Sequence, residues 1–287
     1  MAKRAAARGA ERKALRRRGP SPQKLAADRR KRRALVEVVL DRLGERYDHP
    51  AWAGPRLDAV SELVLTILAQ NTADINSFRA FTALRARYAN WDEVLSGPTD
   101  ELEEVIRPGG LAPTKSRRIQ QVLAEVHDAH PDWDLSSLGT MPLADALAWL
   151  TALPGIGRKT ASIVLLFCFG RPTMPVDTHI HRVALRLGLI PPRTDLTRAH
   201  DLLEGALGAD EVYPFHVEAI RHGRDTCRAP RPICGLCPLT DVCPYYVLAS
   251  RGRAPMAPVP RLPGGEDAPP RYHDRLLHGW APPEHAR

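Results

Sequence analysis

Four of the five cysteines of the chain lie close enough together to bind one metal centre. They are Cys227, Cys234, Cys237 and Cys243, in the pattern C-x6-C-x2-C-x5-C. In a reducing compartment such a group binds metal more readily than it forms disulfides. Structural zinc sites usually combine two short Cys-x2–4-Cys knuckles, and only Cys234 and Cys237 form one here. The uneven spacing therefore favours one loop wrapped around a [4Fe-4S] cluster over a zinc ion.

A second candidate site lies in the segment LPGIGRKTA, residues 153–161. Pro154 and Gly155 predict a turn after one helix, and Gly157 allows a close approach of the backbone before the next helix begins. The free N–H groups at the start of that helix, together with its dipole, would favour a bound anion such as a phosphate. An ordinary corner between two helices also uses glycine and proline, so the segment alone leaves both interpretations open.

Lys159 is predicted in the first turn of the helix that follows this hairpin. There the helix dipole and the neighbouring Arg158 both disfavour the ammonium form. On an open surface the side chain would extend into water, but in a cleft the same penalty leaves a usable amine nucleophile. Asp177, eighteen residues further on, stands where an aspartate would cap the next helix. A carboxylate fixed in this way could also stabilise a sugar cation or transfer a proton.

Helices must position these residues, because helical periodicity dominates the middle of the chain. Apolar residues recur three and four positions apart, and no run alternates for long enough to predict a strand. The predicted fold class is therefore all-α, with Cys168 as a core residue of one apolar helix. The expected helices cover residues 33–47, 58–70, 74–88, 113–130, 142–152, 158–169, 178–189, 197–207 and 212–224.

The positive charge of the chain is concentrated at one end. The formal net charge is +8, yet residues 1–33 carry 14 Lys and Arg against two acidic residues, so the remainder is slightly acidic. Residues 1–33 are expected to form a disordered basic arm, either drawn to nucleic acid or simply solvated. Residues 251–287 contain eight prolines and are expected to form a second disordered arm, to which no role is assigned.

Two features of the sequence predict that the protein lies in the cytoplasm. No run reaches the roughly 18 apolar residues that a membrane span needs, so no membrane partner is expected. The first 33 residues lack the apolar core and the cleavage site of a secretory signal.

Four motifs in a fixed order give the chain a resemblance to a known family. LPGIGRKTA, VDTHIHRV, HGRDTC and the cysteine pattern together resemble the endonuclease III family of helix-hairpin-helix DNA glycosylases, over about residues 34–246. The resemblance implies two helical lobes with DNA bound in the groove between them. One would be a six-helix barrel with the helix-hairpin-helix motif, residues 61–171. The other would be an iron–sulfur lobe made of residues 34–60 and 172–250.

The resemblance also implies roles for single residues. Lys159 would attack C1′ of a damaged nucleotide flipped out of the duplex, with Asp177 as its partner carboxylate, and β-elimination would then cut the strand 3′ to the lesion. A [4Fe-4S] cluster would be the cofactor. The partner would be double-stranded DNA with damaged bases or abasic sites, bound by a monomer associated with the nucleoid. Gln70 would fill the gap left by the flipped nucleotide, and DNA phosphates would be held by Gly155, Gly157, Arg228 and Arg231.

The residues themselves leave several alternatives open. Gln70 could be an ordinary helix-terminal glutamine, and Arg228 and Arg231 could simply be solvated. After Gln70 the chain reads NTADIN, which does not match the thymine-glycol enzymes closely, so the preferred lesion is undetermined. The adenine-mismatch branch has a glutamate where this chain has Thr66 and lacks the lysine, which disfavours adenine excision.

The sequence thus predicts a bifunctional DNA glycosylase and abasic-site lyase that acts on oxidised pyrimidines. One alternative is a mismatch glycosylase that removes thymine or uracil opposite guanine. Another is a non-catalytic DNA-binding protein, against which the pair of Lys159 and Asp177 argues. No second metal site is expected at His179, His181, His216 or His222, because lone histidines on helices are more often packed or exposed than ligating.

Overall fold

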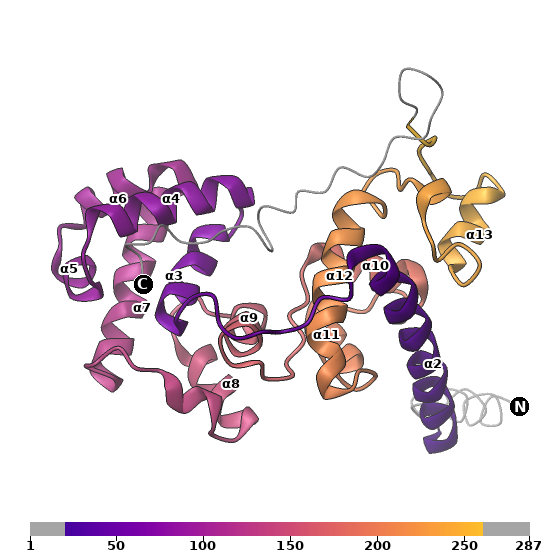
Figure 1. The fold of residues 1–287 in the computed structure, drawn as a ribbon, viewed down its shortest axis with the longest axis horizontal. Helices are drawn as coiled ribbons and strands as arrows, with labels where there is room; N and C mark the ends of the chain where they lie inside the picture. Colours follow the sequence, from indigo (N-terminus) through magenta and orange to yellow (C-terminus); the bar gives the residue numbers. More distant parts are fainter. Residues whose placement is uncertain (1–20, 261–287) are drawn as a thin grey trace, which may run out of the picture.

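The computed structural model describes residues 21–260, which form two groups of helices side by side (Figure 1). No strand occurs in this range, which confirms the all-α prediction. The first lobe contains α3 (Ala59–Ala69), α4 (Asp74–Arg87), α5 (Trp91–Ser96), α6 (Thr99–Ile106), α7 (Ala112–Ala129), α8 (Leu143–Ala152) and α9 (Arg158–Phe169), with the 3-10 turns η1 (Arg107–Gly109) and η2 (Ser136–Gly139). The second lobe contains α2 (Pro22–Tyr47), α10 (Thr178–Leu187), α11 (Leu196–Glu204), α12 (Val212–Asp225) and α13 (Pro244–Ser250), with the 3-10 turns η3 (Ala209–Glu211) and η4 (Cys234–Leu236).

Each lobe has its own hydrophobic core. The first core includes Leu63 and Phe81, and the second includes Leu43 and Phe215, all of them fully or almost fully buried. Helix α9 contributes to both, because its buried side chains point to two sides along the helix. Two non-contiguous parts of the chain therefore meet around one shared helix.

Local signals fix where the helices near the lobe boundary begin and end. Asp58 and Asp177 occupy the N-cap positions of α3 and α10, where each carboxylate accepts a hydrogen bond from a backbone N–H of the first turn. Gly170 ends α9 in the left-handed conformation, with φ of 63°. Above Gly170 lies the indole ring of Trp52, so closely that a Cβ at this position would come within 2.9 Å of it.

The structure corrects the expected end of the basic arm at residue 33. Helix α2 begins at Pro22 after the N-cap Ser21, so residues 22–33 are helical. This segment has few apolar residues to bury, but its side chains form hydrogen bonds with other parts of the second lobe. Arg32 Nε donates to the Leu189 carbonyl over 2.6 Å, and Arg33 forms a two-pronged ion pair with Glu211. The rest of the expected arm, residues 1–20, lies outside the described residues.

The expected start of the second arm at residue 251 is also wrong. Residues 251–260 follow α13 and lie along the cysteine-containing loop. The Ala257 N–H donates to the Pro232 carbonyl over 2.8 Å, and the Val259 side chain lies against Gly235. Backbone hydrogen bonds of this kind do not depend on a hydrophobic pattern, so proline content alone could not show them. Residues 261–287 lie outside the described part of the chain.

Among the described residues, no helix combines the length and the apolar character needed to cross a bilayer.

The ion pair between Arg33 and Glu211 gives a test of the ordered start of α2. Replacing Arg33 with alanine is expected to lower the free energy of unfolding by about 1 kcal/mol, because a partly buried two-pronged pair is lost. The matched control is Arg30→Ala on the exposed side of the same helix, expected to change stability by less than about 0.5 kcal/mol. Urea denaturation measures both, and equal stabilities of the two variants would contradict the packing of this segment.

Candidate active site

A pocket of about 260 Å³ lies between the two lobes and brings together three of the residues singled out in the sequence. Lys159, Asp177 and Gln70 all line it, although they come from α9, from the start of α10 and from the end of α3. Aromatic and aliphatic side chains form much of the remaining wall, namely those of Trp52, Leu57, Leu65, Phe78, Ile163, Phe167, Tyr213 and Ile220. A concave, largely apolar site with a few polar groups is typical of small-ligand binding.

The hairpin between α8 and α9 places Lys159 at this pocket. Gly155 adopts a φ of 69°, and the Ile156 N–H closes the turn on the Leu153 carbonyl over 3.1 Å. Gly157 is the N-cap of α9, and a Cβ at this position would meet no atom within 4 Å. Within the described residues, the N–H groups of Gly155, Gly157 and Arg158 have no hydrogen-bond acceptor. The hairpin therefore offers free donors beside open space at a helix N-terminus, which suits a phosphate.

Gln70 is tied to the same hairpin. It follows the last residue of α3, and its side-chain Nε2 lies 3.4 Å from the Gly155 carbonyl, which it can approach as a donor. This contact places the end of α3 beside the beginning of α9.

Lys159 is exposed, and Asp177 is half-buried. Within the described residues Lys159 has no ion-pair partner, so its amine is available to a ligand. One carboxylate oxygen of Asp177 accepts the Ile180 N–H over 2.8 Å, which leaves the other oxygen for further contacts. Helix capping and a role toward a ligand are therefore compatible in Asp177.

The charge of Arg158 is compensated, which the sequence did not reveal. Its guanidinium donates to the Glu204 carboxylate of α11 over 2.8 Å, and the other oxygen of Glu204 accepts the Met174 N–H over 3.0 Å. On the other side of the pocket, Arg224 of α12 forms an ion pair of 2.5 Å with Asp74 of α4. These pairs join the two lobes at the edges of the pocket.

His216 lies beneath Asp177 and is buried. Its Nδ1 lies 3.1 Å from the Pro175 carbonyl. Burial lowers the pKa of His216 to about 4, although the nearby Asp177 carboxylate opposes this shift. The imidazole is therefore uncharged at neutral pH and adds no positive charge next to Lys159.

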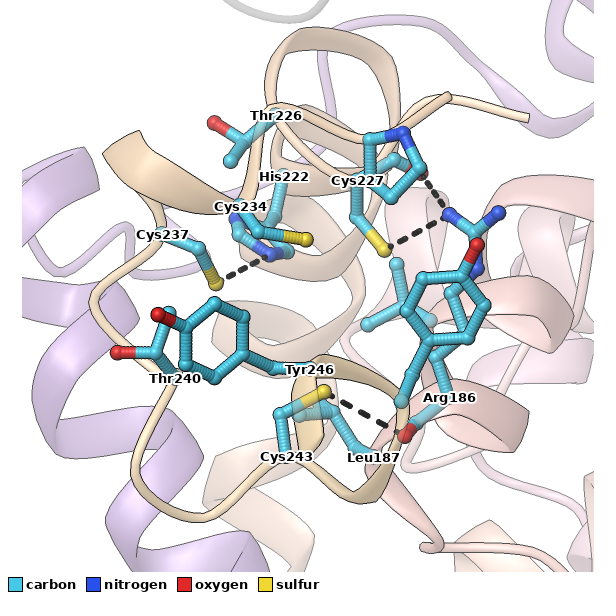
Figure 2. Close-up of a pocket in the computed structure, with 13 residues that line it drawn as sticks. Arg186, Leu187, His222, Thr226, Cys227, Cys234, Cys237, Thr240, Cys243 and Tyr246 are labelled. Atoms are coloured by element: carbon cyan, nitrogen blue, oxygen red, sulfur yellow. Dashed lines mark hydrogen bonds between the residues drawn. The ribbon is translucent and has the colours of Figure 1, made fainter. Parts of the chain in front are cut away.

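The four clustered cysteines line a second, small cavity, bounded by α10, α12, α13 and the loop between them. Figure 2 shows their sulfur atoms directed into one central space. Arg186 donates to Cys227 Sγ over 3.3 Å, and His222 Nε2 lies 3.6 Å from Cys237 Sγ. Burial raises the pKa of the Cys237 thiol to about 12.

The four thiols line one small cavity, and in the described part of the chain no group of three His, Cys, Asp or Glu side chains stands as a ready-made site for a metal ion.

Arg228 and Arg231 are exposed on the loop between the first two cysteines and do not line the pocket of Lys159. Arg228 Nε donates to the Asp225 carbonyl over 2.9 Å, and Arg231 Nη2 donates to the Met256 carbonyl over 3.2 Å. Each guanidinium keeps further N–H groups that can reach a ligand.

Leu111 is a candidate that the sequence analysis missed. It is 57% exposed, and its φ of 50° is unusual for leucine. Thr72 joins its loop to that of Gln70, because the Thr72 hydroxyl contacts both the Gly109 and Gln70 carbonyls, at 2.6 and 3.2 Å. An apolar residue after the pair Gly109 and Gly110 was the only signal in the sequence.

Comparisons with known proteins show the family to which the chain belongs. Residues 64–205 match the family model described as "HhH-GPD superfamily base excision DNA repair protein", which defines the class of the protein. The endonuclease III of Sulfolobus acidocaldarius is 32% identical over 68% of this chain and 85% of its own length. The endonuclease III of Treponema pallidum is 36% identical over 72% of this chain and 94% of its own length. The chain therefore belongs to the endonuclease III family of base excision DNA repair glycosylases, which confirms the resemblance seen in the sequence.

Solved structures support the same assignment. A trapped covalent intermediate between endonuclease III and DNA matches with a TM-score of 0.67 and 26% identity, over 76% of this chain and 99% of that one. A thermostable thymine-DNA glycosylase matches with a TM-score of 0.61, but at 19% identity it shows the fold alone.

Two glycine substitutions test the hairpin as a phosphate site. Gly157→Ala places a methyl group in the open space beside the free N–H groups, so we expect about a 10-fold loss of affinity for duplex DNA, with a loss of stability of about 1 kcal/mol at most because alanine is a poorer N-cap than glycine. Gly155→Ala strains a residue with positive φ, so we expect it to lower stability as well, by about 1 kcal/mol. Fluorescence anisotropy and urea denaturation separate the two effects. Unchanged DNA affinity in Gly157→Ala would exclude a close phosphate at this position.

Proposed function

We propose that this chain is a bifunctional DNA glycosylase and abasic-site lyase that removes oxidised pyrimidines from double-stranded DNA. The observation that carries the proposal is the meeting of an unpaired lysine and a fixed carboxylate at one pocket between two lobes. We further propose that the protein acts as a monomer on nucleoid DNA in the cytoplasm.

In this reaction the base must leave the duplex to reach Lys159. The lone pair of Nζ forms a bond to C1′ of the flipped nucleotide, while the bond between C1′ and the base breaks and its electrons leave with the base, which takes up a proton. Opening of the sugar ring gives an iminium ion between Lys159 and C1′. Removal of a proton from C2′ then expels the 3′ phosphate, and water finally releases the lysine.

Asp177 would support the first step in two ways. Its free oxygen can accept a proton from the Lys159 ammonium group, and its negative charge can stabilise positive charge that develops on the sugar. Because the other oxygen is held by the Ile180 N–H, the carboxylate is already oriented before DNA binds.

Three features would hold the DNA in the required shape. The hairpin N–H groups of Gly155 and Gly157 would bind a phosphate near the lesion. Gln70 and the exposed Leu111, on neighbouring loops, would occupy the space left in the duplex by the flipped nucleotide, a role for which apolar side chains are suited. Arg228 and Arg231 would contact phosphates further along the backbone.

We propose that Cys227, Cys234, Cys237 and Cys243 hold a [4Fe-4S] cluster. The four sulfurs directed into one cavity are compatible with this cofactor, and the uneven spacing C-x6-C-x2-C-x5-C supports it over zinc. When bound, the cluster supplies a rigid cross-link of the loop and a one-electron redox centre. Arg186 would offset the negative charge of the thiolates through its contact with Cys227.

Lys159→Ala is expected to abolish covalent trapping. With borohydride and DNA that contains an abasic site, the unaltered protein should form a stable cross-link, because borohydride reduces the iminium ion. The matched control is Lys31→Ala on the exposed side of α2, which should still cross-link. Asp177→Asn keeps a capping side chain for α10 and should slow base excision by a factor of about 10²–10⁴ without unfolding the protein.

Two results would contradict this mechanism. Cross-linking that persists in Lys159→Ala would assign the nucleophile to another amine. Absence of cross-linking in the unaltered protein, with excision only of thymine or uracil opposite guanine, would favour the mismatch glycosylase instead.

The cofactor is tested by metal content and by absorption. The purified protein should contain about four iron atoms per chain and show broad visible absorption. Cys234→Ala should lose both, whereas Cys168→Ala, which changes the buried cysteine of α9, should keep both. Stoichiometric zinc without iron would overturn the assignment.

A further inference from the structure

The pocket of Lys159 is elongated and runs along one face of α3. Its lining from α3 consists of Glu62, Leu65, Thr66, Ala69 and Gln70, which recur three and four residues apart. Glu62 and the C-cap Gln70 are eight positions apart, so the pocket extends about 12 Å along α3.

Helix α9 packs directly against α3, runs antiparallel to it and lines the same pocket. Near its beginning, the Gly155 carbonyl faces Gln70, and near its end, the Cys168 thiol lies close enough to Glu62 to feel its charge. Lys159 and Gln70 therefore lie at one end of the pocket, and Glu62 lies at the other, with Phe167 of α9. A base whose sugar carbon is at Lys159 would point its far edge toward Glu62.

The surroundings of Glu62 favour its neutral form. Burial raises the pKa of Glu62 to about 7, and the nearby Asp58 carboxylate raises it further, whereas a hydrogen bond with Thr66 opposes the shift. Other titratable and charged groups face the same pocket from the neighbouring elements. They are Arg56 before α3, Asp74 of α4, Lys159 of α9, Asp177 before α10, and Tyr213, His216 and Arg224 of α12. Cys168 of α9 is also near Glu62, although it does not line the pocket.

We propose that Glu62 reads the far edge of the flipped base through a neutral carboxyl group, whose hydroxyl donates and whose carbonyl accepts. This inference rests on the proposed function. A uracil-type base offers N3–H and O4 at this edge, and a cytosine-type base offers N3 and the amino group. A carboxylic acid can pair with either order, because its two oxygens can exchange roles. A carboxylate can only accept hydrogen bonds, so it would lose one of the two hydrogen bonds with either base.

This role explains why the pocket holds a carboxyl group where most of its wall is apolar. A polar group in such surroundings is costly when only part of its hydrogen-bonding capacity is used, and a leucine at position 62 would continue the apolar wall. The alternative is that Glu62 only stabilises the first turn of α3 through the helix dipole. That role would change the free energy of unfolding, but it would not change the relative rates on different DNA substrates.

The first test compares substrates with and without a base. Duplexes carrying a single 5-hydroxyuracil, a single 5-hydroxycytosine or an abasic site are given to the same preparation under single-turnover conditions. For Glu62→Leu we expect the ratio of base excision to abasic-site cleavage to fall at least about 10-fold for both bases, as for a lost specific hydrogen bond. The control is Glu125→Leu on the exposed side of α7, which should keep the ratio of the unaltered protein.

The second test uses pH. Glu62→Gln keeps a donor and an acceptor at every pH, so it should excise both bases well at pH 6. Above pH 7 the excision rate of the unaltered protein, divided by that of Glu62→Gln, should fall by up to about 10-fold for each pH unit, because only the unaltered side chain ionises. Dividing the two rates cancels any other pH dependence that both proteins share.

The outcomes distinguish this inference from the function on which it rests. An unchanged excision ratio in Glu62→Leu, or a rate quotient that does not vary with pH, would overturn the role of Glu62 while the enzyme remains a glycosylase. If the unaltered protein acts on none of the three duplexes, the proposed function itself fails, and the role of Glu62 fails with it.

Discussion

The packing of α9 between two hydrophobic cores is the constraint on which the rest of the structure depends. Leu165 of this helix is buried in the first lobe, and Leu166, the next residue, is buried in the second. Moving α9 would therefore cost apolar contacts on both sides at once. Because Lys159 stands in the first turn of this helix, its position relative to Asp177 is set by two cores rather than by a flexible loop.

The charges around the pocket are arranged so that few remain free. Arg158 is paired with Glu204, and Arg224 is paired with Asp74. Lys159, one residue after Arg158, has no such partner among the described residues. The sequence suggested that Arg158 would repel the Lys159 ammonium group, but the structure shows that Glu204 offsets much of this charge.

Much of the fold could be predicted from the sequence because its signals are local. The helices around Lys159 and Asp177 follow from apolar periodicity, from a capping aspartate and from the glycines of the hairpin. The short helices α5 and α6 were missed, since six to eight residues give little periodicity. The helical start of α2 was missed for another reason. Arg32 and Arg33 are held by partners more than 150 residues away, which no local pattern reveals.

The sequence predicted the site only in part, for the same reason. Motif order pointed to Lys159, Asp177 and the four cysteines, and the structure places the first two at one pocket and the cysteines around another. The sequence analysis did not single out Glu62, an acidic residue in the first turn of α3. Its distance from Lys159 along the pocket depends on the antiparallel packing of α3 and α9, and thus on contacts between residues about a hundred positions apart.

The segment that lies along the cysteine loop has a consequence for how the protein is made. Residues 255–259 contact this loop through Pro232, Gly235 and Tyr245, yet they leave the ribosome after Cys243. All four thiols are thus synthesised before the segment that lies along their loop. During translation there is an interval in which the cysteine loop is complete and these contacts cannot yet form.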